Sequence, residues 1–242
     1  MNLIDSGDIA AVLLSLKVAA TATLFGLPAA LVVAYVLARR QFPGRALLDA
    51  VTYLPLVLPP VATGYLLLVL FGHQGVIGRA LEAVGVVFAF RWTGAALAAA
   101  VMAFPLMVRP IRLSIEAIDH EVEDAARSLG ASTWARLRRV TLPLAAPGLI
   151  AGAVLGFARA LGEFGATITF VAAIPGETLT LPSAIYEATQ SPGGEARTLT
   201  LCAISLVISF AAVLLGEQLS PSRRVAARKS TAHGSPGPGT AR

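Results

Sequence analysis

Five long apolar segments, separated by shorter polar ones, constrain this chain more than any other feature. They cover residues 9–38, 47–71, 93–115, 144–172 and 199–219. An α-helix rises 1.5 Å per residue, so about 20 residues cross the ~30 Å hydrocarbon core of a bilayer, and each segment reaches that length. Only 14% of the residues are charged, against about a quarter in a soluble domain. The predicted fold is therefore all-α: a polytopic membrane protein with five transmembrane helices.

Basic residues gather on one side of these segments if successive segments alternate in direction. That side holds 14 of the 19 lysines and arginines, namely Arg39, Arg40, Arg45, Arg109, Arg112, Arg127, Arg136, Arg138, Arg139, Arg223, Arg224, Arg228, Lys229 and Arg242. The opposite side holds only Arg79, Arg91 and Arg197. Because short basic loops stay in the cytoplasm, we predict an N-terminus outside the cell and a cytoplasmic C-terminus.

Residues 220–242 differ from the rest of the chain. They are rich in Gly, Pro and Ser, carry five basic residues and no acid, and lack apolar periodicity. This composition predicts a disordered basic cytoplasmic tail, which follows a transmembrane domain at residues 9–219. The remainder of the chain has balanced charges, so the net charge of +5 is no argument for nucleic-acid binding.

Prolines interrupt the second and third apolar segments. Each proline lacks a backbone N–H and clashes with the preceding helical turn. We therefore expect kinks at Pro55, Pro59, Pro60 and Pro105. Carbonyl groups freed by a kink are tolerated in a membrane where they face protein or water, so the kinks suit a transport pathway, and equally suit plain helix packing.

The polar loop at residues 116–143 is longer and more patterned than a simple connector needs. Its first part places Ala125, Ala126 and Leu129 on one helical face, and Gly130 is typical of a helix end. Ser132 or Thr133 can cap a second short helix that carries Trp134 and Leu137, and Pro143 is expected to close the unit. The pattern predicts a compact two-helix surface, either for docking a cytoplasmic protein or for lying on anionic lipid.

This loop resembles the cytoplasmic loop of binding-protein-dependent ABC importer permeases. The family pattern is an acid and two alanines, then any three residues and a glycine, then any nine residues, an aliphatic residue, any residue and Leu-Pro. Asp124, Ala125, Ala126, Gly130, Val140, Leu142 and Pro143 fill these positions, with Asp124 where Glu is usual and Glu123 adjacent. The resemblance implies a type I ABC importer permease fold whose 121–137 loop enters a groove of a separate ATPase subunit.

The residues marked for ATPase coupling are Glu123, Asp124, Ala125, Ala126, Gly130, Trp134, Leu137, Leu142 and Pro143. The stretches 37–68, 101–119 and 158–196 resemble the molybdate permease subfamily in particular, with sulfate/thiosulfate and tungstate permeases as alternatives. The resemblance implies a homodimer in the inner membrane, two ATP-binding cassette subunits and one external oxyanion-binding protein. No GxxxxGK[ST] sequence occurs, so we expect a non-catalytic chain without a cofactor, whose partner binds ATP and Mg²⁺.

Two ionisable residues lie deep in the fourth apolar segment, four residues apart. Arg159 either offers positive potential to a passing anion or forms with Glu163 a neutral pair that fixes a bend beside the neighbouring glycines. A stand-alone secondary transporter is a rival hypothesis, but it predicts repeats and an ion-binding set at the midplane. A membrane enzyme is another, but it needs clustered His, Asp or Cys residues. The sequence shows neither pattern and suggests no metal site.

Overall fold

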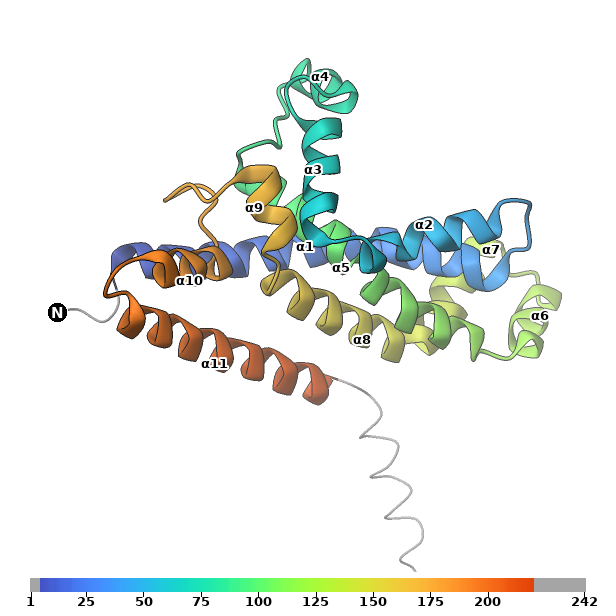
Figure 1. The fold of residues 1–242 in the computed structure, drawn as a ribbon. Coiled ribbons are helices and arrows are strands. Elements are labelled where there is room, and N and C mark those ends of the chain that lie inside the picture. Colours follow the sequence, from blue (N-terminus) through green and yellow to red (C-terminus); the bar gives the residue numbers. More distant parts are fainter. Residues whose placement is uncertain (1–4, 220–242) are drawn as a thin grey trace, which may run out of the picture.

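The computed structural model describes residues 5–219, and every regular element in that range is helical (Figure 1). The elements are α1 (Ser6–Arg39), α2 (Arg45–Val57), α3 (Pro60–Phe71), α4 (Val76–Glu82), α5 (Trp92–Glu116), α6 (His120–Ser128), α7 (Thr133–Arg136), the π-helical turn η1 (Leu137–Thr141), α8 (Leu142–Leu161), α9 (Gly165–Val171), α10 (Leu181–Gln190) and α11 (Glu195–Leu219). The predicted tail at 220–242 lies outside the described residues.

Four helical stretches in the described range are long and apolar enough to cross a membrane: α1, α5, α11 and the continuous run Thr133–Leu161 that ends in α8. A fifth span exists if the bent pair α2 and α3 is taken as one crossing. The all-α fold with four to five candidate spans confirms the expected class. The side of the membrane on which each terminus lies stays a prediction.

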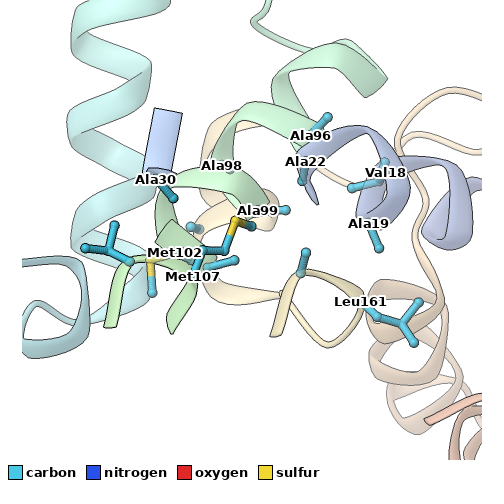
Figure 2. Packing of buried hydrophobic residues seen from close by; sticks show 14 of the residues in the cluster. Val18, Ala19, Ala22, Ala30, Ala96, Ala98, Ala99, Met102, Met107 and Leu161 are labelled. Carbon is cyan, nitrogen blue, oxygen red and sulfur yellow. The ribbon is translucent and has the colours of Figure 1, made fainter. Parts of the chain in front are cut away.

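Helices α1, α5 and α8 form the packed centre of the molecule, and small residues line their contacts (Figure 2). Lipid tails are as apolar as leucine, so membrane helices gain little from burying large apolar groups and associate instead through close backbone approach. Ala19 and Ala22 of α1 are buried together with Ala98 and Ala99 of α5. On α8, a Cβ atom at Gly156 would lie 2.5 Å from the Met107 side chain of α5. A side chain at position 156 would therefore force the Met107 side chain to move.

The second expected segment, 47–71, is broken in two. Helix α2 ends at Val57, Leu58 and Pro59 are extended, and α3 begins at Pro60 at an angle of 117° to α2. Pro60 suits the first position of a helix, where no N–H partner is needed. Helix α3 thus leaves the bundle crosswise and carries α4 at its tip (Figure 1). Pro55, in contrast, lies inside α2 without interrupting it.

Pro105 likewise lies inside one continuous helix, α5, which also contains Pro110. The fourth expected segment, 144–172, is two helices, because α8 ends at Leu161 and α9 begins at Gly165. Helix α9 then packs on α3, with a Cβ at Gly64 meeting the backbone of α9 at 2.4 Å. The two short helices that follow the chain breaks therefore form one paired unit beside the main bundle.

Helix α1 is longer than a membrane is thick, since its 34 residues extend about 51 Å at 1.5 Å per residue. Lys17 places its Nζ 3.6 Å from the ring centre of Trp92, the first residue of α5. Near the N-terminal end of α1, the buried Asp8 carboxylate accepts two bonds from the Arg197 guanidinium of α11, at 2.9 and 2.6 Å. Polar contacts therefore fasten α1 to α11 beyond the apolar core.

Candidate functional site

The loop predicted from the sequence lies at one end of the bundle, beside the connection between α1 and α2 (Figure 1). Its first helix, α6, begins at the cap Asp119, whose side chain accepts a bond from the N–H of Glu121 at 3.0 Å. Gly130 follows α6 with φ +81°, a left-handed conformation that favours glycine. The Ser132 hydroxyl then accepts a bond from the N–H of Ala135 at 3.2 Å and caps α7. Local sequence signals therefore set both short helices.

The second helix of the loop does not stop where the sequence suggested. Helix α7 continues through η1 directly into α8, so Pro143 lies in the first turn of α8 and does not close a separate unit. The N–H of Leu142 bonds the carbonyl of Leu137, five residues back. A proline at position 143 lacks an N–H and crowds the carbonyl four residues before it, and a wider turn relieves that clash. The second half of the loop, from Thr133 onward, is therefore a helical extension of α8.

One face of this loop is apolar and open. Leu129 is 89% exposed and Trp134 is 68% exposed, one on each side of the turn at Gly130. Ala125 is also exposed, while Ala126 and Leu137 are half-buried. Such large exposed apolar side chains at a helical corner are typical of a protein contact surface.

The remaining predicted loop residues divide between surface and interior. Asp124 is exposed and pairs within α6 with Arg127 at 3.4 Å. Leu142 is half-buried and Pro143 exposed. Glu123, the neighbour of Asp124, is only 8% exposed and points into the bundle. The two adjacent acids therefore point in different directions. The sequence alone could not show which of them is buried.

Glu123 joins a buried polar cluster that no sequence pattern indicated. Its Oε1 atom lies 3.3 Å from Nη2 of Arg39 and accepts a hydrogen bond from the hydroxyl of Thr141 at 3.1 Å. The same Arg39 nitrogen donates to the carbonyl of Ile118 at 3.0 Å. These residues are far apart in the sequence, so no local spacing reveals their contact.

Arg159 and Glu163 lie at the joint between α8 and α9, away from the loop. Arg159 Nη1 is 2.6 Å from Glu163 Oε2, and Glu163 Oε1 accepts a hydrogen bond from the N–H of Ala166 at 2.7 Å. Glu163 is 2% exposed, whereas the Arg159 side chain is 27% exposed. Both carboxylate oxygens are thus engaged within the joint. Among the described residues, no group of three or more His, Cys, Asp or Glu side chains could hold a metal ion.

Comparison with known proteins identifies the relatives of this chain. The model of the family described as binding-protein-dependent transport system inner membrane component matches residues 26–225. The "Molybdenum transport system permease protein ModB" of Escherichia coli (strain K12) is 57% identical over 211 residues, covering 87% of this chain and 92% of that protein. The "Sulfate transport system permease protein CysW" of Synechococcus elongatus is 38% identical over 206 residues, covering 84% of this chain and 71% of that protein.

A solved structure shows the same fold. It is a bacterial alginate ABC transporter in complex with an alginate pentasaccharide-bound periplasmic protein; the TM-score is 0.73 at 20% identity, over 91% of this chain and 80% of that one. At this identity the likeness shows the fold alone. The family match, by contrast, spans most of the residues and includes the loop and both chain breaks. The chain therefore belongs to the binding-protein-dependent transport system inner membrane components, a family of membrane transport subunits rather than catalytic enzymes.

Proposed function

We propose that this chain is the membrane subunit of an ATP-driven importer that moves molybdate into the cell. Family membership and the 57% identity to a molybdenum permease support this substrate. The 38% identity to a sulfate permease keeps sulfate or thiosulfate as the alternative, and tungstate is a further one because it mimics molybdate. These are divalent, tetrahedral oxyanions, so we assign their discrimination to an external binding protein and not to this chain.

The observation that carries the proposal is the exposed pair Leu129 and Trp134 at the tip of a loop that continues rigidly into α8. A large apolar surface held on a stiff element suits insertion into a groove of another protein. In the proposed complex, that protein is an ATP-binding cassette subunit, which holds ATP and Mg²⁺. Two copies of this chain, each carrying one such subunit, enclose a pathway on their two-fold axis.

The proposed cycle is alternating access. ATP binding draws the two ATPase subunits together, and their motion pulls the loops of both copies inward. The pathway then opens outward and accepts the oxyanion from the docked binding protein. Hydrolysis separates the subunits and returns the pathway to the inward-open state. Such rigid-body coupling requires that the loop does not bend, and the unbroken helical run from Thr133 to Leu161 supports this requirement.

Purification and reconstitution test the proposal. The chain, isolated in mild detergent, should bring down an ATPase in equal number. In proteoliposomes with the binding protein, molybdate should stimulate ATP hydrolysis more than sulfate does. Trp134→Ala should weaken ATPase retention, while Leu206→Ala on the exposed face of α11 should not. Purification without any ATPase would overturn the importer, and stimulation by sulfate alone would overturn molybdate as the substrate.

A further inference from the structure

The buried Glu123 carboxylate is the one feature of the loop that the docking role does not use. Its exposed neighbour Asp124 faces outward and pairs only within α6, so Asp124 is available to a docked partner. Glu123 faces away from that surface and touches the bundle. Two acids one residue apart on a helix lie about 100° apart around its axis, so they can serve two different surfaces.

Glu123 contacts Arg39 and Thr141, and Arg39 extends the cluster to the end of α5. Arg39 is the last residue of α1, and its Nη2 atom lies 3.3 Å from Glu123 Oε1. The same nitrogen donates at 3.0 Å to the carbonyl of Ile118, two residues after the end of α5. Thr141, whose hydroxyl donates to Glu123 Oε1 at 3.1 Å, ends η1 and leads into α8. One carboxylate oxygen therefore connects α6 to the ends of α1 and α8, and through Arg39 to α5.

The side chains of this cluster are buried, which favours a single arrangement of their contacts. Glu123 is 8% exposed, the Arg39 side chain is 5% exposed, and Thr141 is 2% exposed. A carboxylate removed from water is stable only while opposite charge and hydrogen-bond donors surround it. Displacing α6 alone would leave the carboxylate without partners, so the cluster favours movement of α6 together with the three core helices.

We propose that Glu123, with Arg39 and Thr141, is a positioning cluster that passes the motion of the loop to α1, α5 and α8 at the same time. This inference rests on the proposed function, because it assigns a role within ATP-driven transport. Without the cluster, α6 is joined to α5 only through residues 117–119 and to α7 only through the turn at Gly130. Both connections are short and non-helical, so α6 would follow the ATPase while the core lags behind.

The first arm of the test separates transport from ATP hydrolysis. Glu123→Gln keeps the shape of the side chain and removes its charge, and Thr141→Val removes one hydroxyl with little change in volume. The control is Glu187→Gln, which removes the charge of an exposed acid on α10, outside the loop. In reconstituted complexes we expect Glu123→Gln to retain its ATPase and hydrolyse ATP, while molybdate taken up per ATP falls by about fivefold or more. Thr141→Val should show a smaller fall in the same ratio, and Glu187→Gln none.

The second arm needs no transport. Cys202 is first replaced by Ser, and spin labels are attached at position 41, after α1, and at position 128, the last residue of α6. The labelled chain is diluted with unlabelled chain, so that the labels report the distance between α1 and α6 within one copy. We expect a narrow distance distribution in the parent and the Glu187→Gln control, and a broad one in Glu123→Gln.

The outcomes separate the two proposals. A narrow distribution in Glu123→Gln, or an unchanged uptake per ATP despite a broad one, would overturn the positioning role. Loss of both hydrolysis and ATPase binding in Glu123→Gln would also overturn it, because Glu123 would then belong to the docking surface. A parent complex that takes up no oxyanion at all would refute the proposed function, and the distance measurement would still report on the cluster.

Discussion

The ion pair at the joint of α8 and α9 offers the sharpest distinction between a structural and a transport role. Arg159→Gln removes the partner of a carboxylate that is 2% exposed and leaves it with the single bond from the Ala166 N–H. Glu163→Gln instead leaves an arginine whose side chain is 27% exposed and can reach water, while the amide oxygen still accepts that N–H. The double variant replaces the pair with two neutral amides.

The expected magnitudes follow from this burial. Breaking a buried ion pair by removing one partner lowers the free energy of unfolding by about 3–5 kcal/mol. Because Arg159 is partly exposed, we expect Arg159→Gln to fall at the lower end, at about 3 kcal/mol. Glu163→Gln should cost about 1–2 kcal/mol, because only a hydrogen bond to a charged group is lost. The double variant should cost about 1 kcal/mol. This is less than the sum of the two single changes, because the two residues are in contact and their effects do not add. For a chain of this length, about 3 kcal/mol corresponds to a fall of about 6–12 °C in Tm.

Thermal unfolding in detergent and molybdate uptake in proteoliposomes test these values together. We expect Arg159→Gln to unfold at the lowest temperature, and the double variant to recover most of the Tm and of the uptake. That recovery would mark the pair as a structural element of the joint. A double variant with near-parent Tm and no uptake would refute the reasoning, because the Arg159 charge would then act on the passing anion directly.

Three further predictions concern backbone and buried polar positions. Gly130→Val should cost about 1–2 kcal/mol, because valine is strained in the left-handed conformation of this residue. Assays of uptake and hydrolysis should show a larger fall in uptake per ATP for Gly130→Val than for Gly130→Asn, since asparagine tolerates that conformation. Gly64→Leu should separate α3 from α9 at a cost of about 1–3 kcal/mol in Tm measurements, whereas Gly7→Ala, which meets no neighbouring atom, should leave Tm unchanged. Ser15→Ala should cost about 1–3 kcal/mol, because the buried Leu181 N–H loses its acceptor at 2.6 Å; equal Tm values would contradict it.

Local patterns were sufficient for the long helices and for the corner of the loop. The apolar segments located α1, α5, α11 and the start of α8 to within a few residues, because membrane thickness fixes the length of each run. The chain break at Leu58 and Pro59 also follows directly from proline chemistry. Pro55 and Pro105 lie inside unbroken helices, so a proline by itself does not locate a helix end.

Long-range contacts could not be read from the sequence. Nothing in the spacing of residues joins Arg39 to Glu123, or Asp8 to Arg197, because each pair forms only when distant helices pack. The continuation of α7 through η1 into α8 was missed for a related reason: a proline at position 143 usually marks a helix boundary, and a π-helical turn that accommodates it has no clear sequence signature.

The proposed transport cycle requires that the loop carries force from a separate ATPase into the membrane helices. Site-specific photo-crosslinking in isolated membranes, where the nucleotide can be removed or added, tests this directly, with the crosslinking residue at position 134 in one variant and at the exposed position 206 of α11 in another. We predict that position 134 crosslinks to an ATP-hydrolysing subunit, with a yield that changes between nucleotide-free and ATP-bound states, and that position 206 does not. Crosslinks from position 134 only to lipid or to proteins outside the cytoplasm would contradict the account.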